Sequence, residues 1–281
     1  MIQDRLRTLV TQNPMLIEIT RFRRRYFSYS SGNSMNSVVL SLVLICYAGL
    51  VLIVAQNRDS INPISIVIFE TGLLTLFAPM MLYGAIAGER ERRSWDLLLA
   101  APITKSQIVA GKFLGAAGAL VIAVAMFQLP ILIAAIGSRE TNWWFLLVAS
   151  LDSLTFLLLV CALTIFFSAR VKRGLMALGA VLAILATGLI VFPTFVEVAG
   201  GSSSTVTNPT LFFHPFYVMA QLMRTIGPGE DAGNAISTLQ WGWPQSFVYF
   251  ALTITLLAWA SNTLSFAENE VKFMPQGDKH A

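Results

Sequence analysis

Residues 143–168 read WWFLLVASLDSLTFLLLVCALTIFFS, an almost uninterrupted apolar run in which Asp152 carries the only charge. A helix of about 20 such residues crosses the hydrocarbon core of a bilayer. The whole 281-residue chain is similar, with 56% hydrophobic and 12% charged residues and a mean hydropathy of +0.68. Soluble domains carry roughly 25% charged residues. The composition therefore excludes a soluble enzyme, a disordered chain and a fibrous protein, and the net charge of +4 does not indicate nucleic-acid binding.

Five further apolar runs are long enough to span a membrane, so the sequence predicts an all-α polytopic protein with six transmembrane helices. The predicted spans are Val38–Ala55, Ile64–Ala87, Ile108–Gly137, Trp143–Ser168, Leu175–Val196 and Ser246–Phe266. They divide the chain into an N-terminal segment (1–37), a six-span domain (38–266) and a tail (267–281).

The positive charges predict the orientation of these spans. Sixteen of the 19 Lys and Arg residues fall on one side of the spans: in the N-terminal segment, in the two loops after spans two and four, in the tail, and at Lys112 just inside span three. Because Lys and Arg accumulate in cytoplasmic loops, we expect both termini in the cytoplasm. Tryptophans favour membrane interfaces, and four of the six lie at predicted outer boundaries: Trp143, Trp144, Trp241 and Trp243.

Two cytoplasmic segments have helical patterns of their own. Asn13 is a good N-cap for an amphipathic basic helix over residues 13–29, which either lies in the membrane interface or serves only as a topology signal. After span two, Ser94 can cap a short helix, Trp95–Ala101, which Pro102 ends. Thr104 and Gln107 then form a capping box ahead of span three. The apolar load of the short helix fits a docking surface for a soluble partner, or equally packing against the membrane.

This stretch resembles the cytoplasmic loop of ABC-2 type permeases, the membrane subunits of ABC exporters. The family pattern has a glutamate-rich run, an acid within a leucine run, a proline, and Gly-Lys opening the next span. This chain departs at Arg93, where the family commonly has glycine, and has Ser94 in place of threonine. The matching residues are Glu89, Glu91, Ser94, Asp96, Leu97–Leu99, Pro102 and Gly111–Lys112.

The resemblance implies that Ser94–Ala101 is a coupling helix that docks on a separate ABC ATPase, and that residues 13–29 form an elbow helix. It also implies a second permease, ATP and Mg²⁺ bound by the ATPase rather than by this chain, and a location in a prokaryotic inner membrane. The residues expected to couple to the ATPase are Glu89, Glu91, Ser94, Trp95, Asp96, Leu97, Leu98 and Pro102.

Two acids lie inside predicted spans. Asp152 is about 13 Å past Trp143, and Glu70 is about 9 Å into span two, at 1.5 Å per residue. Intramembrane acids face protein or a water-filled cavity, so both are candidates for lining a substrate path. Alternatively each is a protonated carboxyl bonded to a neighbouring hydroxyl, or Glu70 lies at a misplaced boundary. The outer segment 197–245 is too apolar for an ordinary loop, which predicts a re-entrant or interfacial hairpin, or else a small extracellular cap.

The sequence has no phosphate-binding Gly-x-x-x-x-Gly-Lys-Ser/Thr loop and no clustered metal ligands. We therefore expect no enzymatic activity, cofactor or metal site in this chain. Two other functions remain open: an ion-gradient-driven transporter that uses Asp152 and Glu70, and a membrane anchor that transports nothing.

Overall fold

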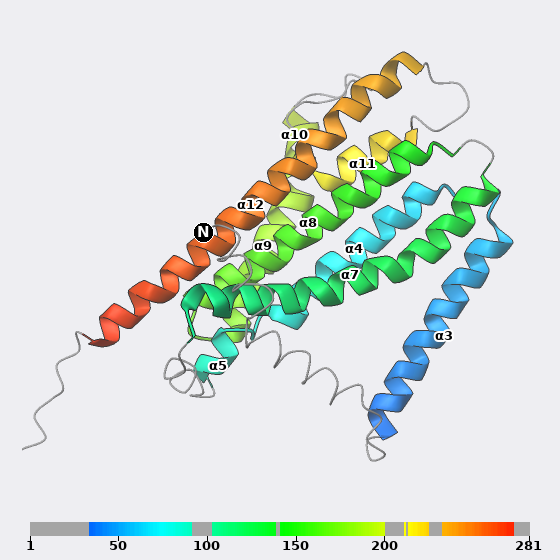
Figure 1. Ribbon diagram of the computed structural model, residues 1–281. Coiled ribbons are helices and arrows are strands. Elements are labelled where there is room, and N and C mark those ends of the chain that lie inside the picture. The colour runs from blue at the N-terminus through cyan, green and yellow to red at the C-terminus, as the bar shows by residue number, and fades with distance from the viewer. Residues whose placement is uncertain are drawn as a thin grey trace, which may run out of the picture.

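The computed structural model describes residues 34–91, 103–138, 141–199, 211, 213–224 and 232–272, and within these ranges every regular element is a helix (Figure 1). The elements are α3 (Ser34–Gln56), α4 (Pro63–Leu82), α5 (Ala87–Glu91), α7 (Lys105–Gly137), α8 (Trp143–Arg170), α9 (Gly174–Ala186), the π-helix η1 (Thr187–Val191), α10 (Phe192–Ala199), α11 (Pro215–Arg224) and α12 (Ala232–Lys272).

Among the described residues, five segments are long and apolar enough to cross a membrane: Pro63–Glu91, Lys105–Gly137, Trp143–Arg170, Gly174–Val196 and Pro244–Leu264. The remaining predicted span, Val38–Ala55, falls within α3, a 23-residue helix whose shorter apolar stretch is Ser41–Gln56. The predicted all-α polytopic fold is confirmed. The predicted elbow helix lies outside the described residues.

Local signals explain where several of these helices begin. Asn62 caps α4 by accepting from the Ile64 N–H at 2.9 Å, and Pro63 is its first residue. The predicted capping box is confirmed at α7, where the Thr104 hydroxyl accepts from Gln107 N and the Gln107 side chain accepts from Thr104 N. Because the first N–H groups of a helix have no partner within it, these side chains fix the helix starts.

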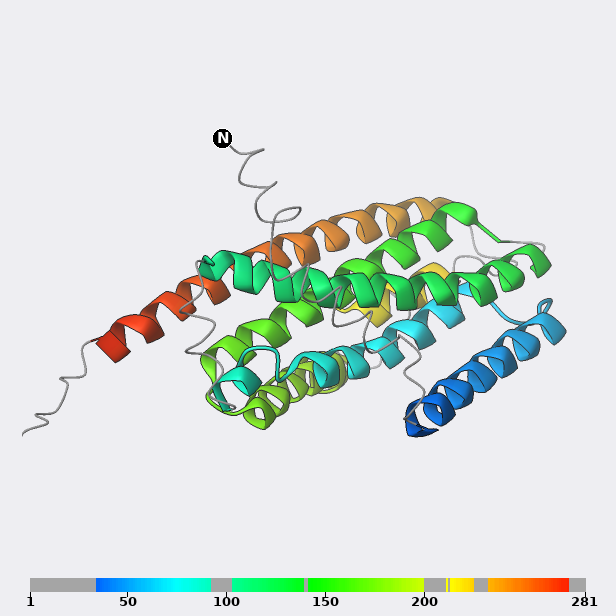
Figure 2. The same ribbon diagram turned by 60° about the horizontal axis from the view of Figure 1, so that its bottom comes forward.

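Helix α8 is the centre of the bundle and packs against α4, α7, α9, α11 and α12. Small residues let helix backbones approach closely in membranes, where dispersion replaces the hydrophobic effect as the main attraction. α8 has a long series of such buried residues: Ala149, Ser153, Cys161, Ala162, Thr164, Ser168 and Ala169. By contrast, α3 stands apart from the other spans in both views and contacts α7 (Figure 2).

The bundle has two chemically different ends. Lys105, Lys112 and Arg170 lie where α7 begins and α8 ends, and we call this the basic end. Trp143 and Trp144 begin α8 at the opposite, tryptophan end. Within the predicted outer segment, 197–245, the short helix α11 packs on α4, α8 and α12. Residues 232–245 of that segment are the first part of α12, so this helix begins before the predicted span Ser246–Phe266. The buried residues Val218, Met219 and Leu222 of α11 join the core at the tryptophan end.

Candidate functional site

A sharp turn interrupts the helix between α4 and α5. The sequence predicted one continuous span over these residues. Helix α4 ends at Leu82, a turn follows with Ala85 N–H bonded to Leu82 O at 2.9 Å, and α5 begins at Ala87. The first hydrogen bonds of α5 start from Ile86 O. Ile86 thus occupies the capping position, but its side chain has no atom that can accept a hydrogen bond.

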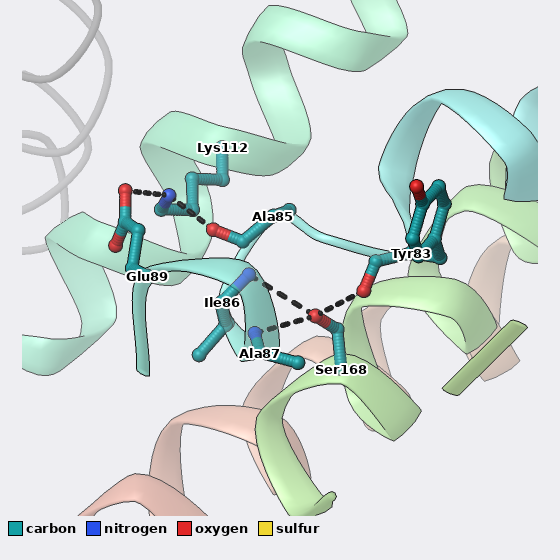
Figure 3. Close-up of polar contacts among 7 residues, drawn as sticks. All are labelled: Tyr83, Ala85, Ile86, Ala87, Glu89, Lys112 and Ser168. Carbon is teal, nitrogen blue, oxygen red and sulfur yellow. Dashed lines mark hydrogen bonds and ion pairs between the residues drawn. The ribbon is translucent and has the colours of Figure 1, made fainter. Parts of the chain in front are cut away.

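Ser168, near the end of α8, supplies the missing cap (Figure 3). Its hydroxyl oxygen accepts from Ile86 N and Ala87 N, each at 3.0 Å, and donates to Tyr83 O at 2.9 Å. A serine hydroxyl has one donor and two acceptor sites, so all three are used. Ser168 is fully buried, and it ties both sides of the break to α8.

Lys112 of α7 forms the second tie. Its ammonium group lies 2.6 Å from Glu89 Oε1 and also donates to Ala85 O, as Figure 3 shows. The Lys112 side chain is only 12% exposed and that of Glu89 29%. A charge-assisted contact of this kind is about twice as strong as a neutral hydrogen bond, so α5 is held firmly against α7.

Glu91 forms the third tie, to the start of α9. Its Oε1 accepts from Gly174 N at 2.8 Å, and the capping position Arg173 provides no side-chain bond of its own. A carboxylate at a helix N-terminus is also stabilised by the helix dipole. Gly174 is closely packed, because a Cβ there would lie 3.1 Å from Tyr83 Cδ2 and the ring would have to move by a few tenths of an ångström.

We call this set the α5 clamp: the backbone from Tyr83 to Ala87, Glu89, Glu91 and their partners Lys112, Ser168 and Gly174. It joins a five-residue helix to three long ones, α7, α8 and α9. The chain passes directly from α5 into residues 92–102, which contain the predicted coupling segment. A displacement of α5 would therefore act on three spans together.

A second group of polar side chains lies inside the bundle, and we call it the interior polar cluster: Thr71, Asp152, Ser153, Gln245, Ser246 and Tyr249. Each of these residues is buried. The Thr71 and Ser153 hydroxyls lie 2.7 Å apart, joining α4 to α8. Asp152 Oδ1 accepts from Ser246 Oγ at 3.3 Å, joining α8 to α12.

Tyr249 connects this cluster to the chain just before α11. Its hydroxyl accepts from Gln245 Nε2 at 2.6 Å and donates to Phe213 O at 2.8 Å. Next to Phe213, His214 Nδ1 accepts from Tyr217 N at 3.0 Å, and Nε2 lies 3.1 Å from Leu189 O in η1. This arrangement requires the proton on Nε2. Burial lowers the pKa of His214, which favours that neutral form.

Tyr249→Phe is expected to destabilise the protein by about 1 kcal/mol, since polar contacts between membrane helices contribute roughly that much. The change leaves the ring but removes the hydroxyl that serves both Gln245 and Phe213 O. Thermal unfolding of the purified protein measures the loss. Tyr47→Phe is the matched control, because it removes only one exposed contact, to Met126 O, and it should shift the melting temperature less.

The amino-acid sequence was also compared with known proteins. A family described as ABC-2 family transporter protein matches residues 25–270, most of the chain. The chain belongs to the ABC-2 transporter family. No curated protein matches it.

In this ABC-2 transporter, the sequence-predicted residues have different outcomes. Ser94, Trp95, Asp96, Leu97, Leu98 and Pro102 lie outside the described residues. Glu89 and Glu91 are described, and their carboxylates bind elements of the bundle itself. Asp152 and Glu70 are both buried, with 0% and 1% exposure. Glu70 lies in α4 directly before Thr71. Its Oε1 has no hydrogen-bond partner among the described residues.

Several residues of the ABC-2 transporter's site were not singled out from the sequence: Ser168, Gly174, Gln245 and Tyr249. Their partners are 4 to 85 positions away, and isolated small or polar residues within apolar runs have no periodic pattern. Lys112 had a signal in the Gly-Lys pair of the family pattern. Within the described residues no group of three His, Cys, Asp or Glu could hold a metal ion.

Proposed function

We propose that this chain is the permease subunit of an ATP-driven ABC exporter, in which it forms the translocation pathway with a second permease and couples to separate ATPase subunits. ATP and Mg²⁺ would bind to the ATPase. Membership of the ABC-2 family supports the proposal, and the charge bias supports an orientation with both termini and the basic end in the cytoplasm. The family resemblance places the subunit in a prokaryotic inner membrane.

The α5 clamp is the observation that carries the proposal. A coupling element must transmit a push from a soluble subunit to several spans at once. α5 fits this role because Lys112, Ser168 and Gly174 connect it to α7, α8 and α9. It also immediately precedes Ser94–Ala101, the segment expected to enter a groove on the ATPase. Closure of the ATPases would then move α5, and the clamp would pass that motion to the pathway.

The proposal predicts that Trp95→Ala/Leu98→Ala weakens assembly with the ATPase more than tenfold. Trp95 and Leu98 are three residues apart, so both occupy one face of a short helix. Loss of an interface hot spot costs about 2 kcal/mol or more, and 1.4 kcal/mol is a factor of ten. The measurement is co-purification of the tagged permease with its co-expressed ATPase, together with ATP hydrolysis.

Trp144→Ala/Leu147→Ala is the matched control. It removes the same two residue types at the same spacing from the tryptophan end, where both side chains are exposed. This control should retain the ATPase at the wild-type ratio. Assembly and transport that survive in the Trp95/Leu98 variant would show that Ser94–Ala101 is not the coupling helix.

A further inference from the structure

Two fully buried oxygen atoms in the interior polar cluster lack a partner. Asp152 Oδ2 and Gln245 Oε1 have no hydrogen bond within the described part of the chain, and both residues are 0% exposed. Both atoms are acceptors. A buried, ionised carboxylate is very costly unless a positive charge accompanies it. The cluster therefore has two acceptors that a cation could satisfy.

Asp152 and Gln245 lie at the same level of the bundle, on neighbouring helices. Helices α8 and α12 run side by side in the same direction (Figure 1). Asp152 pairs with Ser246, the rings of Phe156 and Tyr249 are 5.4 Å apart, and those of Phe166 and Trp259 are 4.9 Å apart. This constant register places Gln245 one residue before the serine that touches Asp152.

Three basic side chains of the described bundle have other surroundings. Lys112 binds Glu89, Arg170 lies over the rings of Phe166 and Trp259, and the Arg58 side chain is 59% exposed. None of these three reaches Asp152. His214 is occupied on both ring nitrogens, by Leu189 O and Tyr217 N. None of these four side chains therefore supplies a positive charge to Asp152.

We propose that Asp152 and Gln245 are ligands of a binding site for one small monovalent cation of the Na⁺ type, between α8 and α12. Carboxylate, amide and hydroxyl oxygens are the ligands that hard cations prefer, and Ser246 Oγ lies beside the carboxylate. One carboxylate balances one positive charge, whereas a divalent ion would leave a buried charge uncompensated. Such a site contains no cluster of acids, histidines and cysteines, because only one of its ligands is charged.

The site is tested on the purified full-length permease without any ATPase, so the result does not depend on the proposed ATP coupling. Its melting temperature is followed at fixed pH and ionic strength while N-methyl-D-glucamine is replaced by Na⁺, K⁺ or Li⁺. We expect a saturable rise in melting temperature of about 3–5 °C with the preferred ion. This is the shift that ligand linkage gives when the ion concentration is about 100 times the dissociation constant. Binding of radioactive Na⁺, or competition against it, should approach one ion per chain.

Asp152→Asn should abolish the ion response and melt at or above the wild type in ion-free buffer, because it removes an uncompensated charge. Asp59→Asn is the matched control: Asp59 is an acid with an 81% exposed side chain, and its variant should respond as the wild type does. Gln245→Leu keeps the charge but removes one oxygen, so the half-saturating ion concentration should rise about tenfold, the factor that corresponds to 1.4 kcal/mol.

Three results would each overturn the proposed site. The first is the same melting temperature in every monovalent ion and in N-methyl-D-glucamine, and the second is an unchanged ion response in Asp152→Asn. The third is a melting temperature that responds to pH alone, which would mean that Asp152 simply holds a proton. If Asp152→Asn does not fold, Gln245→Leu decides the matter. A shifted half-saturation supports the site, and an unshifted one removes Gln245 from it and overturns the proposal.

Discussion

Lys112→Met is expected to lower the free energy of unfolding by about 3 kcal/mol, because removing one partner of a buried ion pair costs 3–5 kcal/mol and this pair is partly exposed. Methionine has nearly the same length, so the change removes the charge with little change in packing. Glu89 Oε1 and Ala85 O lose their contact with the ammonium group. In the assembled exporter we expect ATP hydrolysis to continue while transport falls, since α5 is no longer held to α7.

Thermal or denaturant unfolding of the purified permease, and the ratio of transport to ATP hydrolysis, measure these effects. Lys172→Met is the control, because Lys172 is an exposed lysine at the same end of the bundle. The double variant Glu89→Gln/Lys112→Met should be more stable than the sum of the single changes predicts, since it leaves no unpaired charge. Strict additivity would show that the Glu89–Lys112 contact has no energetic role.

Ser168→Ala is the second change with a large expected effect, also about 3 kcal/mol. The substitution removes one oxygen but leaves three backbone groups without their partner: Ile86 N, Ala87 N and Tyr83 O. Each buried polar group left unsatisfied costs roughly 1–3 kcal/mol, and partial relaxation of the turn reduces the sum. Loss of the cap should free the start of α5 from α8.

Hydrogen exchange of the Ile86 and Ala87 amides reports this release directly, and it should accelerate far more than exchange in the middle of α8. Ser261→Ala provides the comparison, because the Ser261 hydroxyl donates only to Ala258 O within its own helix. Unchanged protection of Ile86 and Ala87 in Ser168→Ala would mean that Ser168 does not hold the break between α4 and α5.

The fold class followed from the sequence because hydropathy and helix caps are local signals. Apolar runs such as residues 143–168 identify spans without knowledge of their neighbours, and Thr104 with Gln107 marks the start of α7 within four residues. The positions of Asp152 and Glu70 inside the bundle followed from the high cost of exposing an acid to lipid.

The α5 clamp could not be predicted in the same way. Ile64–Ala87 reads as one apolar run. Pro79 and Gly84 lie in it, but both residue types are common within membrane helices and do not by themselves mark the turn at Tyr83–Ile86. That turn is stabilised by a serine more than 80 residues later, and serine is unremarkable within an apolar helix. Likewise, Glu89 and Glu91 match a docking motif, yet their carboxylates bind Lys112 and Gly174 of the same chain. These contacts depend on partners that are distant in the sequence, and a local sequence pattern carries no information about such partners.

The central place of α8 also has a consequence for the order of synthesis. Of the helices around it, α4 and α7 are made earlier, whereas α9, α11 and α12 are made later. Ser246, the partner of Asp152, is synthesised 94 residues after it. At 5–20 residues per second this delay is about 5–20 s. During that interval the Asp152 carboxyl lacks its partner on α12, although Ser153 and Ser168 can already reach their partners in and after α4. A nascent chain that stops before α12 leaves this carboxyl without its partner in the bilayer, where cellular quality control can recognise the chain as incomplete.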